Sequence, residues 1–260
     1  MIYMKSGMKR CSLAMWLLFA ASHGSSTLAS PYVFSARTSY VTIPNPSGGS
    51  SFRSESSIPQ IEHLSTPTSI AWSDAEAWNA LIAKHIGGPE KSSVCAGGRG
   101  DIYKKSNVDI ASVLLIGVTV ERSDQCHITM PTYPGTENDS YRRETHYNIV
   151  MMRSAVRDLE PEDLFSRGDD WKRVLTEHLE SEAKESMRRY EWHPPAEAMK
   201  SFATDPSNWI IGSNAFGIRV NKGDLAAPDT MDAFTVTIPW KDLQSVLSFK
   251  GKRILNARNW

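Results

Sequence analysis

The chain has few cysteines, no long hydrophobic run and none of the short motifs that mark common active sites. Its three cysteines include no CxxC pair, which excludes the usual zinc-ribbon and thiol-redox motifs. Its seven histidines form neither HExxH nor His-x-His, so each is expected to be an isolated side chain rather than a metal ligand. No GxSxG occurs, so the nucleophile elbow of an α/β-hydrolase is missing. We therefore expect no metal and no cofactor.

The beginning of the chain has the features of a secretory signal peptide. Three basic residues precede the apolar run Cys11–Ser22, and a small-residue stretch then ends at Ala29. This order predicts cleavage between Ala29 and Ser30. The alternative is a membrane anchor, but the run is shorter than the ~20 apolar residues that a spanning helix needs. We expect a protein of the periplasm or the extracellular medium, without a membrane span after cleavage.

Cleavage changes the charge balance only slightly. It would leave 26 basic residues (29 − 3) against 29 acidic ones, a net charge of −3. This balance provides no basic surface for nucleic acid, so no nucleic-acid partner is expected. A mildly acidic exported protein is compatible with a basic protein partner.

Two cysteines remain after the predicted cleavage. In an oxidising compartment Cys95 and Cys126 are expected to form one disulfide, which would stabilise the fold by about 3 kcal/mol through loop closure. The alternative is a pair of buried free thiols.

The first half of the chain alternates between strand and helix patterns. Thr38–Pro44 predicts an edge strand within a Ser- and Pro-rich loop. An S-x-x-E capping box at Ser73–Glu76 predicts a helix that ends before Gly87. The β-branched segment Val108–Ser123 predicts one long or two consecutive strands, and its expected hairpin partner is Thr145–Val156, after a loop at Ile128–Tyr141.

The second half begins with a long amphipathic helix, expected from Asp169 to Tyr190. Strands are expected at Asn208–Asn221 and Ala233–Trp240, followed by a short helix at Lys241–Ser248. This order predicts an α+β fold, in which two main helices pack on a largely antiparallel sheet. The expected organisation is a signal peptide at 1–29, an N-terminal strand, loop and helix part at 30–100, the main region at 101–248 and a tail at 249–260.

The segment Arg157–Trp171 (RDLEPEDLFSRGDDW) contains two acidic clusters, which could be catalytic or structural. Pro161 suits the first turn of a short helix, where neighbouring carboxylates favour the positive end of the helix dipole. Gly168 can supply a positive φ, and Asp169 is a candidate N-cap for the long helix. Each acidic residue thus has a structural explanation, and we favour the structural interpretation over a catalytic one.

This segment also resembles the signature L-x-L-x-D-L-F, followed by a spaced Trp and Leu, of an extracytoplasmic domain family. These DUF3298-like domains include the lysozyme-sensing C-terminal domain of the anti-sigma factor RsiV and an accessory domain of the deacetylase PdaC. The matching residues are Leu159, Asp163, Leu164, Phe165, Trp171 and Leu175, with Phe216–Val220, Val236–Trp240 and Leu243 resembling the closing strands of the family. The resemblance covers about Asp101 to Ser248 and implies an exported α+β domain without an active site of its own.

The sequence departs from the family at the loop Ile128–Tyr141 and at the segment between the last two strands, where the usual tyrosines are missing. We expect a protein partner to contact Thr129–Tyr141 of this loop, with Tyr133 and Tyr141 as anchors and with Glu137 and Asp139 complementing a basic enzyme. The alternative for this loop is simple solvent exposure.

The resemblance implies a non-enzymatic binding protein whose partner is a lysozyme-like peptidoglycan hydrolase, bound as an inhibitor or an immunity protein. No domain precedes the predicted signal, so a transmembrane sensor is not expected. Two alternatives stay open: an envelope hydrolase or esterase with a site assembled from distant residues, and a glycan-binding envelope protein with exposed tryptophans.

Overall fold

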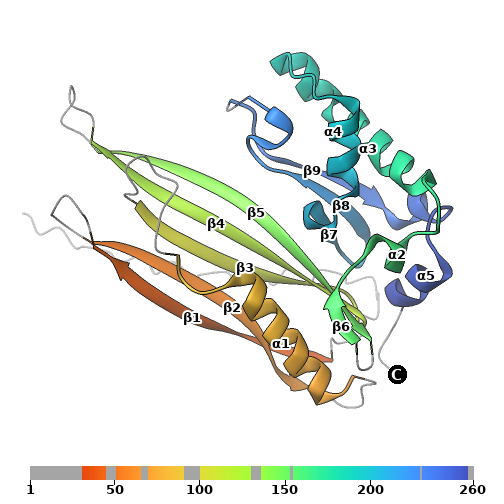
Figure 1. The fold of residues 1–260 in the computed structure, drawn as a ribbon, viewed down its shortest axis with the longest axis horizontal. Helices are drawn as coiled ribbons and strands as arrows, with labels where there is room; N and C mark the ends of the chain where they lie inside the picture. Colours follow the sequence, from red (N-terminus) through yellow and green to blue (C-terminus); the bar gives the residue numbers. More distant parts are fainter. Residues whose placement is uncertain are drawn as a thin grey trace, which may run out of the picture.

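The computed structural model describes residues 31–44, 51–65, 70–90, 100–129, 136–152, 155–228 and 230–256, without the side chains of 127–129 and 136–140. Within this part the chain forms an α+β fold with a six-stranded sheet, a three-stranded sheet and five α-helices (Figure 1). The fold class is as expected, and the large sheet is mostly antiparallel. The expectation of two main helices is not confirmed.

The six-stranded sheet follows the order of the sequence. Its strands are β1 (Tyr32–Ile43), β2 (Phe52–Leu64), β3 (Gly100–Ser112), β4 (Leu115–Thr129), β5 (Thr136–Met152) and β6 (Ala155–Asp158). Helix α1 (Trp72–Ile86) connects β2 to β3, so these two strands run parallel while the other neighbours are antiparallel hairpins. One continuous sheet therefore crosses the boundary expected near residue 100.

The remaining elements form a second layer near the right-hand end of the large sheet in Figure 1. They are α2 (Pro161–Leu164), α3 (Asp170–Tyr190), α4 (Ala196–Thr204), the 3₁₀ turn η2 (Pro206–Asn208), β7 (Trp209–Ile211), β8 (Ala215–Val220), the turn η3 (Asp224–Ala226), β9 (Phe234–Pro239), the turn η4 (Trp240–Leu243) and α5 (Phe249–Leu255). Strands β7, β8 and β9 make the small antiparallel sheet. No helix in the described residues is long and apolar enough to cross a membrane.

Alternation along β4 and β5 places the large sheet between two hydrophobic cores. Ile116 and Ile149 face a first core with Trp78 and Ile82 of α1. Leu115 and Val150 face the other way, into a second core with α3, α4 and the small sheet. Both cores lie at the same end of the large sheet, so its strands extend to the left beyond them (Figure 1).

The expectation of one short edge strand within a loop before residue 70 is wrong in part. Strand β1 is longer than Thr38–Pro44, and the Ser-rich segment that follows forms β2. The inward positions of β2 include Ser54 and Ser56, both fully buried, where apolar side chains are usual. Small hydroxyl residues at alternate positions gave no hydrophobic period, so the pattern did not predict this strand.

The bounds of several other elements also differ from expectation. Helix α1 begins earlier, with Ala71 as N-cap in place of Ser73, and the Ala71 N–H donates to the Asp74 carboxylate at 3.3 Å. Strands β4 and β5 extend into the expected loop, which shortens it on both sides. The expected helix at Lys241–Ser248 is only the 3₁₀ turn η4, and the last helix is α5, in the segment expected to be a tail.

Candidate functional site

The family-like residues of the acidic segment build the second core rather than a site. Phe165 and Trp171 stack with ring centroids 4.9 Å apart, and Trp209 meets both rings edge-on. Phe216 continues the cluster against Trp209 and Trp240. Trp171 and Trp209 are buried and Trp240 is half-buried, so these three side chains provide no exposed platform for a glycan.

The carboxylate of Asp163 joins three elements and has a structural role. It accepts two hydrogen bonds of 2.7 Å from Arg157, one of 2.5 Å from Lys250 and one of 2.9 Å from the Glu160 backbone N–H. Its side chain is only 1% exposed, and burial opposes its charge. The hydrogen bonds outweigh burial and hold the pKa of Asp163 below its ordinary value. This supports the structural interpretation of the segment, together with the positive φ at Gly168.

A polar layer joins the edge of β5 to the small sheet. Asn221 accepts from the Glu144 N–H at 2.8 Å and donates to the Glu144 carbonyl at 3.0 Å, which completes the hydrogen bonding of this edge residue as a paired strand would. Arg219 of β8 donates to the Glu144 carboxylate at 3.0 Å, and Arg143 pairs with Asp224 at 2.9 Å. These hydrogen bonds and ion pairs hold the second layer on the large sheet, in addition to the packing of the second core.

His146 is buried inside this layer, with 4% of its surface exposed. Thr119 Oγ1 donates to Asp109 at 3.0 Å, so it must accept from His146 Nδ1, which lies 2.9 Å away. Nε2 of the neutral imidazole is then unprotonated, and it has no hydrogen-bond partner among the described residues. Burial, and next the charge of Arg219, lower the pKa of His146 to about 4.

The low pKa of His146 predicts a loss of stability in mild acid. The unfolded imidazole binds a proton near pH 6.5 and the folded one only near pH 4, so stability rises with pH across this window. Acidification from pH 7 to 4.5 should cost about 2 kcal/mol from this residue. Urea unfolding at several pH values measures it, and His146→Gln, which cannot titrate, should lose this part of the slope. An identical slope in both proteins would contradict the assignment.

A cleft of 230 Å³ opens beside His146, where β5, β6, α1 and η2 meet. It is lined by His85, His146, Tyr147, Asn148, Asp158, Leu159, Pro206 and Ser207. His85 stacks on Tyr147 and its Nε2 lies 2.6 Å from Asp158 Oδ1. The cleft brings a serine and a His–Asp pair together, although Ser207 donates no hydrogen bond to either histidine among the described residues. The arrangement therefore lacks the aligned nucleophile and base of a hydrolase.

A second surface, which we call the distal polar face, lies on the part of the large sheet that extends beyond the cores. Glu55, Tyr103, Ser123 and Arg142 are register partners and form one row across β2, β3, β4 and β5. With Lys105, Glu121 and Gln125 they line a hollow of 260 Å³. Partial burial, and next the Asp101 carboxylate, raise the pKa of Tyr103 above its ordinary value.

The distal polar face continues to the edge strand β1, whose Tyr40 is 68% exposed. The Arg53 guanidinium lies 4.9 Å from the Tyr40 ring centroid and pairs with Glu55 at 2.8 Å. Across the row, Arg142 lies 3.8 Å from Glu121. The surface therefore offers charges of both signs, the exposed ring of Tyr40 and the half-buried ring of Tyr103. This surface was not predicted from the sequence, although polar residues alternate along β3 at Asp101, Tyr103, Lys105 and Asn107.

Three of the residues expected to bind a partner are positions of β5. Tyr141 is 37% exposed, and because side chains alternate along a strand it points to the opposite face of the sheet from Arg142. Glu137 and Asp139 are positions of β5 opposite Ile128 and Cys126 in β4, not parts of a loop, and their side chains lie outside the described part. Tyr133 and Cys95 lie outside the described residues, so the role of Tyr133 stays a prediction. Cys126 is buried on β4, opposite Gly100 of β3.

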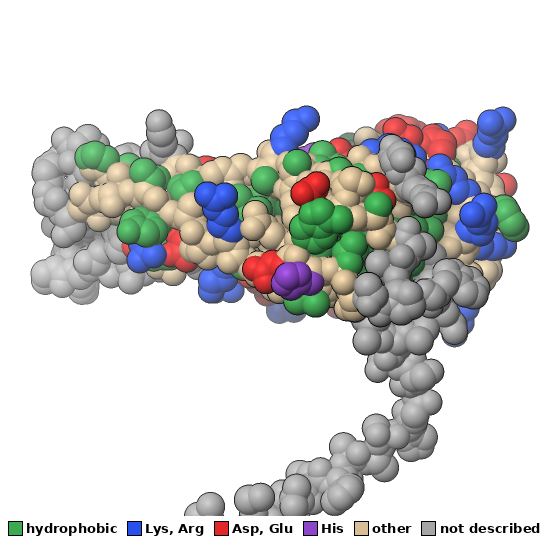
Figure 2. Space-filling view, turned by 90° about the horizontal axis from the view of Figure 1, so that it is seen from below, with side chains coloured by type: hydrophobic (Ala, Val, Ile, Leu, Met, Phe, Trp, Pro, Cys, Tyr) green, Lys and Arg blue, Asp and Glu red, His purple; other side chains and the backbone are tan. Residues whose placement is uncertain are grey.

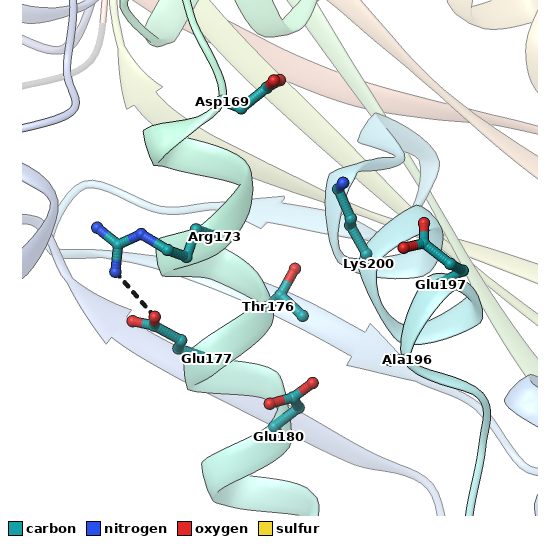
Figure 3. A pocket seen from close by; sticks show the side chains of 8 residues that line it. All are labelled: Asp169, Arg173, Thr176, Glu177, Glu180, Ala196, Glu197 and Lys200. Atoms are coloured by element: carbon teal, nitrogen blue, oxygen red, sulfur yellow. Dashed lines mark hydrogen bonds and ion pairs between the residues drawn. The ribbon is translucent and has the colours of Figure 1, made fainter.

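A groove of 320 Å³ between α3 and α4 is shown in Figure 3. Glu180 and Thr176 of α3 point toward α4, which contributes Glu197 and Lys200. Arg173 pairs with Glu177 along α3 at 2.8 Å. The charged side chains that line the groove have mixed signs and belong to two solvated helices. The groove is therefore a weaker candidate for a binding site than the distal polar face. Within the described residues no group of three or more His, Cys, Asp or Glu side chains is arranged to hold a metal ion.

Comparison with known proteins gives no match to a family model and none to a curated protein. Among solved structures, a DUF3298 family member from Bacteroides fragilis NCTC 9343 is similar at a TM-score of 0.56 and 15% identity, over 88% of this chain and 97% of that one. A DUF3298 family protein from Pseudomonas aeruginosa PAO1 is similar at a TM-score of 0.50 and 11% identity, over 85% and 96%. The relation to RsiV and PdaC stays a prediction. This chain therefore has the fold of the DUF3298 family proteins, the DUF3298-like domain that its sequence motifs resemble.

Proposed function

We propose that this is an exported, non-enzymatic binding protein whose partner contacts the distal polar face and the adjoining end of the β4–β5 hairpin. The observation that carries the proposal is the row Glu55, Tyr103, Ser123 and Arg142 on strands that extend beyond both cores. The outer parts of these strands contribute few side chains to either core. A role of their exposed surface in binding a partner would explain their length. Exposed tyrosine and arginine side chains are typical of such surfaces.

The partner is a protein in this proposal, and its class is a lysozyme-like peptidoglycan hydrolase of the bacterial envelope. The support for the class is the resemblance of the sequence motifs, together with the fold shared with DUF3298 family proteins. Binding would make the chain an inhibitor or an immunity protein. The paired charges of Arg53 with Glu55 and of Arg142 with Glu121 would confer specificity rather than bulk attraction, since neither sign dominates.

The test measures binding and residual cell-wall lysis with a panel of purified lysozyme-type hydrolases. For a hydrolase that binds, Arg142→Glu should weaken affinity at least ~10-fold, because it reverses an exposed charge at the β5 end of the row. The matched control is Lys184→Glu on the solvent side of α3, which should leave affinity unchanged. Equal loss in both variants would place the contact elsewhere, and no binding to any member at micromolar concentration would contradict the proposed partner class.

The second candidate is an envelope hydrolase or esterase, and it is favoured only by the cleft with His85, His146, Asp158 and Ser207. Ester substrates should be cleaved by the purified chain and not by its Ser207→Ala variant under this alternative. Equal background rates for the two proteins would remove it.

We propose in addition that export oxidises Cys95 and Cys126 to a disulfide. The short segment from Cys95 to Gly100 can reach Cys126, because Gly100 and Cys126 are register partners. Peptide mass spectrometry without reductant should find the two cysteines linked and a mature chain that starts at Ser30. Reduction should lower the free energy of unfolding by about 3 kcal/mol. Alkylation of both thiols in the unreduced, exported protein would contradict the prediction.

A further inference from the structure

We propose that two copies of this chain pair through the outer edge of β1, antiparallel, so that their six-stranded sheets become one continuous sheet. In the described part of the chain β1 pairs only with β2, and it is the first strand of the sheet. Among the residues that the structure describes, the backbone N–H and C=O groups of its other edge have no strand partner. Such an edge is a template for another strand, unless the sequence blocks it.

The sequence of β1 has few of the features that usually prevent another strand from pairing with a sheet edge. Between Phe34 and Thr42 there is one charged residue, Arg37, and neither proline nor glycine. The free edge of β5 is covered at two places: Asn221 completes the hydrogen bonding of Glu144, and the Leu159 N–H donates to the Asn148 carbonyl at 2.8 Å. β1 is thus a long edge strand of β-branched, aromatic and small residues that lacks such protection.

The second copy is the fitting occupant because β1 is complementary to itself about Thr38. Antiparallel pairing centred there places Phe34 opposite Thr42 of the partner, Ala36 opposite Tyr40, and Thr38 opposite itself. Paired residues differ by an even number of positions, so the groups that point away from β2 in one copy meet their counterparts in the other.

This register also suits the side chains. Thr–Thr pairs across strands are favourable, and the one charge, Arg37, faces Ser39 rather than its own copy. Tyr40, which is 68% exposed, gains a neighbour in Ala36. The predicted mature chain has a net charge of only −3 (26 basic against 29 acidic residues), so repulsion between copies is weak.

β1 lies along the lower border of the sheet in Figure 1, and Figure 2 views the molecule from that side. On this face hydrophobic, basic and acidic side chains are interspersed among backbone and other polar atoms. A surface of this kind is suited to association by backbone hydrogen bonds with small side-chain contacts, as in β-strand addition.

The first test is the molar mass of the purified chain, by light scattering after size exclusion, over about 1–100 μM. The wild type should change from monomer to dimer in this range. Thr38→Lys should remain a monomer, because it places two ammonium groups opposite each other at the two-fold axis. Thr38 is exposed, so the substitution should change the stability of the monomer little. The matched control is Thr237→Lys, at an exposed position of the other edge strand β9, which should dimerise as the wild type does.

The second test fixes the register. Thr38→Cys should form an intermolecular disulfide under mild oxidation, since strand partners lie within bonding range for two cysteines. Ser35→Cys should not, because its counterpart in the dimer lies on the far side of the axis. A wild type that stays monomeric throughout, or a Thr38→Lys variant that dimerises equally well, would overturn the proposal. Neither result depends on the hydrolase partner, so the two proposals fail separately.

Discussion

Replacing Gly251 by alanine is expected to lower the free energy of unfolding by about 3 kcal/mol or more. A Cβ at this position would lie 2.7 Å from Leu164 C and 2.8 Å from its Cα, and nearer still to the carbonyl oxygen. All three are backbone atoms, so no side chain can rotate away. Helix α5 would have to move off the α2 corner.

That movement would disturb contacts on both sides of α5. The Ser248 N–H donates to the Leu164 carbonyl at 2.8 Å, and Ser112 Oγ donates to the Ile254 carbonyl at 2.5 Å. Ile254 is buried in the second core. The helix therefore connects the α2 corner to β3, and displacing it would loosen both.

The measurement is chemical and thermal unfolding of the purified variant, with an expected fall in Tm of about 8 °C. Inside an unconstrained helix, glycine to alanine is stabilising by about 1 kcal/mol, so the sign of the change is diagnostic. The control is Gly88→Ala, where an added Cβ meets nothing within 4 Å and the backbone has no positive φ. Equal stability of Gly251→Ala and wild type would show that α5 does not dock as described.

Asp163→Asn is expected to cost about 3 kcal/mol, because it removes the buried charge that two cations share. The asparagine amide keeps one acceptor oxygen but turns an N–H group toward Arg157 or Lys250, which lie at 2.7 and 2.5 Å from the carboxylate. The corner formed by β6, α2 and α5 loses its common acceptor. Circular dichroism should show a folded protein with a lower urea midpoint.

The effect of Asp163→Asn depends on pH in a defined direction. The pKa of Asp163 is lowered in the folded state, so its contribution is complete above the unfolded pKa and is lost as pH falls through the folded pKa. The difference between variant and wild type should therefore shrink in strong acid. Asp169→Asn is the control: Asp169 is exposed and pairs with Lys172 at 2.6 Å, and its loss should change stability little. Similar losses in both variants would contradict the role of burial.

The sequence predicted those parts of the fold whose pattern is local. The α3 stripe of Trp171, Leu175 and Leu179 has helical spacing, and all three side chains are buried. Pro161 occupies the first turn of α2 and Gly168 has a positive φ, and these backbone positions favour proline and glycine. The residue types alone therefore mark the corner. Strand β2 was missed because its buried positions hold serines, whose burial depends on their neighbours in space.

The candidate surfaces depend on contacts between distant segments, and only the tertiary structure decided them. The row Glu55, Tyr103, Ser123 and Arg142 exists because four strands align in register, and no local spacing encodes that alignment. His146 acquires its low pKa from burial beneath Arg219 of another sheet. By itself the sequence determined the α+β class, the core of the α2–α3 corner and the resemblance to DUF3298-like domains, because periodicity and turn residues act locally. The surfaces and the buried charges were decided by how the strands pair and what covers them.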